Sequence, residues 1–231
     1  MTPLLLIPGL LCNESLWRGQ IHALGDYVQA MVADVTCQES IRTMAQAVLE
    51  SAPKRFCLAG FSLGSQVALE IMQTASERVE KLALLSATSG GLLPPVKAAI
   101  ENAMTMIQQG DFEKYVEQSY GTYVHPLRAN DAALKRTFTD MARAVGPDAG
   151  LRQMRALLSI TGPFTDLDRI HCPTAIIGGR QDHRTTLAAH KELAQHIRGS
   201  VLTTIEDSGH FTPIEQPSSV TQAMQRWLTR A

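Results

Sequence analysis

Short apolar runs alternate along the chain with longer segments in which apolar residues recur at helical spacing. The runs cover residues 4–7, 27–32, 56–61, 82–85, 174–177 and 201–205, and most are followed by Gly, Ser, Asp or Thr. Their length and composition are typical of buried β-strands. Strands that alternate with helices usually form parallel sheets. The pattern therefore predicts an α/β fold with a mostly parallel sheet of about six strands flanked by helices.

Three segments carry apolar stripes at spacings of three, four or seven residues, as one side of a helix does. The stripes are Trp17, Ile21 and Leu24; Ile41, Met44, Ala45, Val48 and Leu49; and Val220, Met224, Trp227 and Leu228. We expect each stripe to pack against the sheet.

The alternation stops between residues 92 and 164. Pro94 and Pro95 open a stretch that is typical of several consecutive helices. These helices are separated by residues that favour turns, namely Gly110, His125 with Pro126, and Gly146 with Pro147. The sequence thus predicts a core formed by residues 1–91 and 165–231, with a helical cap inserted at residues 92–164.

Composition and charge exclude several classes of partner. The chain has 231 residues, 45% of them hydrophobic, which is enough to bury the core of one domain with an insertion. The formal net charge is -1 and no run of Lys and Arg is dense, so we expect no nucleic acid partner. No segment has the roughly 18 uninterrupted apolar residues that a membrane span needs, so we expect no membrane partner. Residues 1–12 lack a basic start and contain Pro8 and Gly9, which favours a buried strand and a turn over a secretion signal.

The four cysteines are scattered along the sequence. Cys12, Cys37, Cys57 and Cys172 form no closely spaced pair, which is typical of neither a disulfide framework nor a zinc site. Cys57 and Cys172, which lie in or beside predicted strands, are interpreted as small core residues. We expect the protein to reside in the reducing cytoplasm and to bind no metal.

The most informative motif is Gly60-Phe61-Ser62-Leu63-Gly64, which lies between a predicted strand and a predicted helix. A tight strand-to-helix turn exposes the central serine above the sheet, and it requires small residues two positions before and after. The N-terminus of the following helix then points its free N–H groups, first that of Leu63, at an oxyanion. The motif makes Ser62 a candidate nucleophile, although a Gly-Ser turn can also be a simple helix cap.

With this motif in its strand and helix context, nearly the whole chain resembles the α/β-hydrolase family. The resemblance implies the α/β-hydrolase fold and the chain order nucleophile, acid, histidine. It points to Asp182 in "TAIIGGRQDH" as the acid and to His210 in "IEDSGHFTPIEQP" as the general base. Some members place the acid after the preceding strand, but "LLSATSGGLLPP" contains no Asp or Glu. The competing interpretation of Asp182 is that it caps the next helix.

The resemblance also suggests where the second oxyanion donor and the pocket lie. The loop after the first strand implies a donor at the backbone of Leu10, with Leu11 as the alternative, although Pro8 replaces the His of the usual His-Gly pair. His125, in the insertion, is a candidate for lining the substrate pocket. His22, His190 and His196 lie in predicted helices and are interpreted as surface or packing residues.

Together these residues predict an acyl-transfer hydrolase. Ser62 attacks a small to medium carboxylic ester, Asp182 orients His210, and the backbones of Leu63 and Leu10 bind the oxyanion. No cofactor is called for, because backbone donors stabilise the charge. One alternative is a C-C bond hydrolase, thioesterase or lyase that uses the same triad, because a fold does not determine chemistry. The other is a non-catalytic ligand-binding protein. The partner is a small-molecule substrate, and the oligomeric state is left open.

Overall fold

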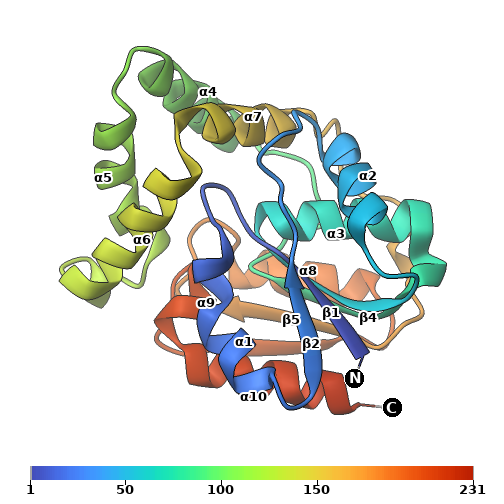
Figure 1. Ribbon diagram of the computed structural model, residues 1–231. Helices are drawn as coiled ribbons and strands as arrows, with labels where there is room; N and C mark the ends of the chain where they lie inside the picture. Colours follow the sequence, from blue (N-terminus) through green and yellow to red (C-terminus); the bar gives the residue numbers. More distant parts are fainter. Residues whose placement is uncertain (1, 231) are drawn as a thin grey trace.

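The computed structural model describes residues 2–230, and its centre is a six-stranded sheet (Figure 1). The strands are β1 (Thr2–Ile7), β2 (Val28–Val32), β3 (Phe56–Phe61), β4 (Val79–Leu85), β5 (Thr174–Gly179) and β6 (Val201–Ile205). Their order in the sheet is β2-β1-β3-β4-β5-β6, and every neighbouring pair is parallel. The predicted α/β fold with about six parallel strands is therefore confirmed.

Burial along the strands follows their position in the sheet. Every residue of the inner strands β3 and β5 is buried, because helices cover both faces of a parallel sheet. The edge strands β2 and β6 are only partly buried, and the Thr residues of β6 lie at this edge. The inner strands therefore consist almost entirely of apolar and small residues, whereas the edge strands contain both apolar and polar residues.

Two layers of helices cover the sheet. On one face lie α1 (Arg18–Leu24) and α10 (Pro217–Thr229), which contact each other. On the other face lie α2 (Ile41–Ser51), α3 (Leu63–Ala75) and α8 (Leu187–His196). The shorter helical segments are η1 (Glu14–Trp17), η2 (Ser76–Arg78), η4 (Leu167–Arg169) and α9 (Thr212–Glu215). Each of the three apolar stripes predicted from the sequence lies mainly in the core.

The segment between β4 and β5 consists of helices, which Figure 1 shows in green to yellow, gathered at one end of the sheet. They are α4 (Pro94–Gln108), α5 (Phe112–Tyr123), η3 (Pro126–Arg128), α6 (Ala132–Val145) and α7 (Pro147–Leu158). The helices end at the predicted Gly and Pro positions: Gly110 and Gly146 have positive φ, and Pro126 and Pro147 begin the next helices. We refer to these five elements as the cap. The division into a core and an inserted domain stays a prediction.

No helix within residues 2–230 is long and apolar enough to cross a membrane.

Candidate active site

Ser62 occupies a strained turn between β3 and α3. Its φ of 53° and ψ of -113° are unfavourable for any residue with a Cβ, and its N–H donates to Leu85 O at 2.9 Å. Ser62 holds the N-cap position of α3, yet its hydroxyl makes no capping hydrogen bond. The side chain is half-buried and its hydroxyl is available for other partners. The simple helix-cap interpretation of the motif is therefore wrong.

The glycines on either side of Ser62 allow the turn to close. A Cβ on Gly60 would overlap the carbonyl group of Gly64, and a Cβ on Gly64 would overlap the carbonyl group of Ile7. These overlaps are with backbone atoms, which cannot rotate away as a side chain can. The motif thus packs β3, the start of α3 and the end of β1 so closely that only glycine fits at both positions.

His210 lies in the loop after β6, and its backbone is held from two sides. Its N–H donates to Tyr123 O in the cap at 2.7 Å, and its carbonyl oxygen accepts a hydrogen bond from the Ser86 hydroxyl at 2.8 Å. The imidazole packs against the rings of Phe61 and Tyr123, with centroids 5.2 and 5.6 Å away. The ring orientation is consequently defined by the sheet, the cap and the core together.

The structure brings the three predicted side chains into one hydrogen-bonded line. His210 Nδ1 lies 2.8 Å from Asp182 Oδ2, and His210 Nε2 lies 2.9 Å from Ser62 Oγ. His210 and Asp182 are 2% and 3% exposed, so water does not compete for the hydrogen bond between them. Because a carboxylate only accepts, the Nδ1–H donates to Asp182, which leaves the Nε2 lone pair to accept the Ser62 hydroxyl.

Asp182 is a carboxylate with every acceptor position used. Besides His210, its Oδ2 accepts the Thr185 hydroxyl at 2.6 Å, and its Oδ1 accepts the N–H groups of Arg184 and Thr185 at 2.8 and 2.9 Å. Burial alone would raise the pKa of Asp182, but the interaction with His210 and these hydrogen bonds outweigh burial and hold the pKa well below its ordinary value. Asp182 is therefore ionised at neutral pH.

The alternative role of Asp182 as a helix cap does not match the structure. The N-cap of α8 is Thr186, whose hydroxyl oxygen accepts the Ala189 N–H at 3.3 Å. Glu206 and Asp207, the two carboxylates that shortly precede His210 in sequence, are exposed, and Glu206 pairs with Arg180. The buried carboxylate that follows, Glu215, accepts the His125 backbone N–H. Asp182 is the carboxylate that contacts the imidazole.

Two backbone N–H groups near the start of α3 have no hydrogen-bond partner among the described residues. Leu63 is the first residue of α3, and its N–H has no acceptor within residues 2–230. The same holds for the Leu10 N–H in the loop after β1, a loop that the close contact between Ile7 and Gly64 brings against the start of α3. The Leu11 N–H, in contrast, donates to Gln153 Oε1 at 2.8 Å. Of the two alternatives from the sequence, Leu10 has the free donor.

His125 is buried within the cap, between α5 and η3, and two of its nitrogen atoms have hydrogen-bond partners in the protein. Its Nδ1 accepts the Leu127 N–H at 3.1 Å, and its backbone N–H donates to Glu215 Oε2 at 2.6 Å. Burial raises the pKa of Glu215, which also lies 3.8 Å from the Arg128 guanidinium. A role of His125 in binding substrate stays a prediction.

Several residues that support the site carried no recognisable signal in the sequence. They are Ser86, Tyr123, Gln153, Thr185 and Glu215. Four of them form a hydrogen bond with a residue that is distant in sequence. The fifth, Thr185, donates to Asp182 within one loop. Only the three-dimensional arrangement reveals them.

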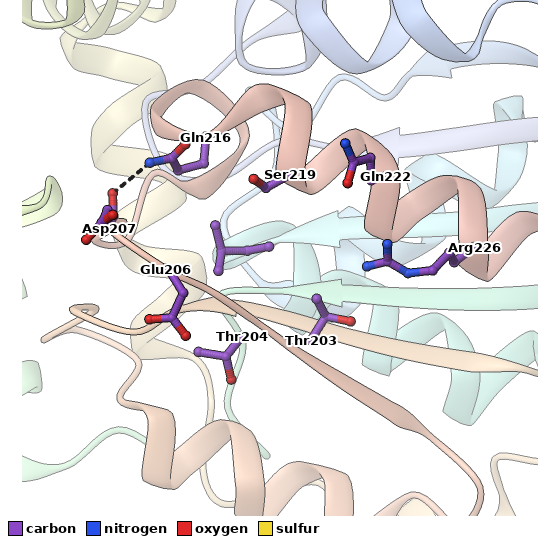
Figure 2. A pocket seen from close by; sticks show the side chains of 9 residues that line it. Thr203, Thr204, Glu206, Asp207, Gln216, Ser219, Gln222 and Arg226 are labelled. Carbon is purple, nitrogen blue, oxygen red and sulfur yellow. Dashed lines mark hydrogen bonds between the residues drawn. The ribbon is translucent and has the colours of Figure 1, made fainter.

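A separate polar groove lies on the surface between β6 and α10 (Figure 2). Thr203, Glu206, Ser219 and Arg226 are among its lining residues, and the Gln216 side chain closes one end by donating to the Asp207 carbonyl at 3.1 Å. None of Ser62, Asp182 and His210 lines it. This groove is not part of the candidate active site.

Comparison with known proteins gives a family match over residues 4–223, to a model described as the alpha/beta hydrolase family. A pimeloyl-[acyl-carrier protein] methyl ester esterase of Nitrosomonas europaea is 22% identical over 90% of this chain and 88% of its own length. Among solved structures, a thermophilic esterase from Thermogutta terrifontis has a TM-score of 0.86 at 22% identity, covering 99% of this chain and 89% of that one. The enol-lactonase from Burkholderia xenovorans has a TM-score of 0.87 at 17% identity, covering 99% and 92%. At these identities the two structures show a common fold.

Proposed function

The chain belongs to the alpha/beta hydrolase family, and we propose that it is a serine hydrolase that cleaves small to medium carboxylic esters through an acyl-enzyme. The observation that carries the proposal is the unbroken line of hydrogen bonds from Ser62 through His210 to Asp182. The names of the relatives support the substrate class, because the methyl ester esterase, the esterase and the lactonase are all named for ester bonds.

In the proposed reaction, Ser62 is the nucleophile and His210 is the general base. His210 Nε2 takes the proton of the Ser62 hydroxyl as Oγ attacks the carbonyl carbon, and returns it to the leaving alkoxide. The same nitrogen then takes a proton from water as the water oxygen attacks the acyl-enzyme, and returns that proton to Ser62 Oγ as the carboxylic acid leaves. Ionised Asp182 keeps the proton of His210 on Nδ1 and stabilises the imidazolium that forms.

The oxyanion is bound by backbone donors in this mechanism. The Leu63 N–H lies at the positive end of α3, and the Leu10 N–H is free in the adjacent loop. Donors that the fold holds in place need no reorganisation as charge develops on the carbonyl oxygen, and each one typically contributes a factor of about 100 to 1,000 in turnover.

The proposal is tested with p-nitrophenyl esters from acetate to decanoate, assayed with the wild type and with Ser62→Ala. We expect turnover by the wild type, loss of turnover in Ser62→Ala, and a chain-length optimum that reports the size of the pocket. A fluorophosphonate should label the wild type and leave Ser62→Ala unlabelled.

The other outcomes distinguish the rival functions. Labelling of Ser62 without hydrolysis of any ester, combined with turnover of thioesters or vinylogous diketones, would identify another reaction on the same triad. Neither labelling nor turnover, combined with tight ligand binding, would identify a binding protein.

A further inference from the structure

One histidine outside the proposed triad is completely buried beside it. His190 lies on α8, has 0% exposure and packs against β5, where a Cβ on Gly178 would overlap its ring. A glycine in an inner strand weakens the strand, so its presence here marks a site of close approach. The absence of a side chain at Gly178 therefore leaves the space on β5 that the His190 imidazole occupies.

The polar contact of His190 is the hydroxyl of Thr185. His190 Nε2 lies 3.3 Å from Thr185 Oγ1, and the same oxygen lies 2.6 Å from Asp182 Oδ2. A hydroxyl has one hydrogen. Since Asp182 is an ionised acceptor, it takes that hydrogen, and Thr185 Oγ1 is left with lone pairs only. The nitrogen of His190 that faces Thr185 must therefore be the donor.

These hydrogen bonds determine which nitrogen of the His190 ring carries the proton. Nε2 carries the proton, and Nδ1 has no hydrogen-bond partner within residues 2–230. Burial lowers the pKa of His190 to about 4, although the Asp182 carboxylate opposes this effect. At neutral pH the ring is uncharged and acts as a single, fixed N–H donor.

We propose that His190 is a positioning residue for the catalytic acid: its Nε2–H holds the Thr185 hydroxyl in the one orientation that donates to Asp182. The inference rests on the proposed function, because it extends the line of hydrogen bonds from Ser62, His210 and Asp182 to Thr185 and His190. Threonine has three staggered χ1 rotamers, and a hydroxyl without an outer partner is free to leave the carboxylate. Neighbouring hydrogen bonds in such a line polarise and strengthen one another.

The first test is a double-mutant cycle on turnover of the best ester substrate. His190→Leu should lower kcat about threefold to tenfold with little change in KM, as expected for the loss of one neutral hydrogen bond. His190→Gln retains an N–H donor of similar reach and should restore most of the activity. His196→Leu makes the same replacement at an exposed position of α8 and is the matched control.

The second arm of the cycle uses Thr185→Val, which removes the hydroxyl. If His190 acts through Thr185, His190→Leu should change kcat less than twofold in the Thr185→Val background. An equal loss of kcat in both backgrounds would overturn the proposal, and so would wild-type kcat in His190→Leu.

A measurement on the unmodified protein keeps the proposal testable if a variant fails to fold or if the protein hydrolyses no ester. Nitrogen-15 NMR of the histidine rings, with His190 assigned in the wild type by nuclear Overhauser contacts between its ring protons and the Hα protons of Gly178, should show a neutral His190 protonated on Nε2 at pH 7. A ring protonated on Nδ1 would overturn the proposal even if the esterase assay succeeds. The expected Nε2–H ring with no esterase activity would refute the proposed function alone.

Discussion

Burial of His190 should make the stability of the protein depend on pH. The pKa of this ring falls from 6.5 in the unfolded chain to about 4 in the folded protein, because the folded state buries it beside Thr185. Each unit of pKa difference is worth about 1.36 kcal/mol, so the full effect is about 3 kcal/mol. For a protein that is stable by 5 to 15 kcal/mol, an effect of this size is readily measured.

The sign follows from which state binds the proton. Above pH 6.5 His190 is neutral in both states and contributes nothing. As the pH falls from 6.5 to 4, the unfolded chain takes up a proton that the folded protein does not, so the free energy of unfolding decreases. Below pH 4 both states are protonated and the loss is complete. Asp182 and His210, the titratable neighbours of His190, are present in the wild type and the variant alike.

The perturbation is His190→Gln, which removes the titration and retains a donor to Thr185. Urea denaturation followed by fluorescence of the buried Trp17 and Trp227 gives the free energy of unfolding at pH 7, 6, 5 and 4.5. The difference between wild type and variant should shift by about 2 to 3 kcal/mol in favour of the variant from pH 7 to pH 4.5. The exposed His196→Gln serves as the control. A difference that is independent of pH would refute the reasoning.

Three further predictions concern the turn at Ser62 and the carboxylate of Asp182. Asp182→Asn should lower kcat about ten-thousandfold with an unchanged circular dichroism spectrum, because an amide disturbs the tautomer of His210; a loss below tenfold would contradict the assignment. Ser62→Gly should be more stable to urea than Ser62→Ala by about 1 kcal/mol, because glycine accepts the φ of 53° that alanine does not; equal stability would argue against strain. Gly64→Ala should lower kcat/KM at least tenfold in the ester assay, because the new methyl group displaces the loop after β1; full activity would show that the turn is more tolerant than its packing indicates.

Local patterns in the sequence account for most of the fold. The run at residues 56–61 is apolar throughout because β3 is buried on both faces, and that is visible without any tertiary information. The breaks at Gly110 and Gly146 were predictable for a similar reason, since both residues adopt a positive φ that ends a helix. The edges of the sheet were less clear: β2 begins at Val28, one residue after the predicted start, because Tyr27 lies at an exposed turn.

The sequence by itself determined the alternation of strands and helices and the tight turn at Ser62, because these depend on residues close together in the chain. It identified Asp182 and His210 through a family resemblance, since nothing in a separation of 148 residues indicates that His210 and Ser62 meet. Only the tertiary structure distinguishes the Leu10 N–H from the Leu11 N–H, because the latter donates to Gln153 on α7. It alone revealed His190 behind Asp182, because hydrogen-bond partners and burial are properties of packed elements that the order of residues does not display.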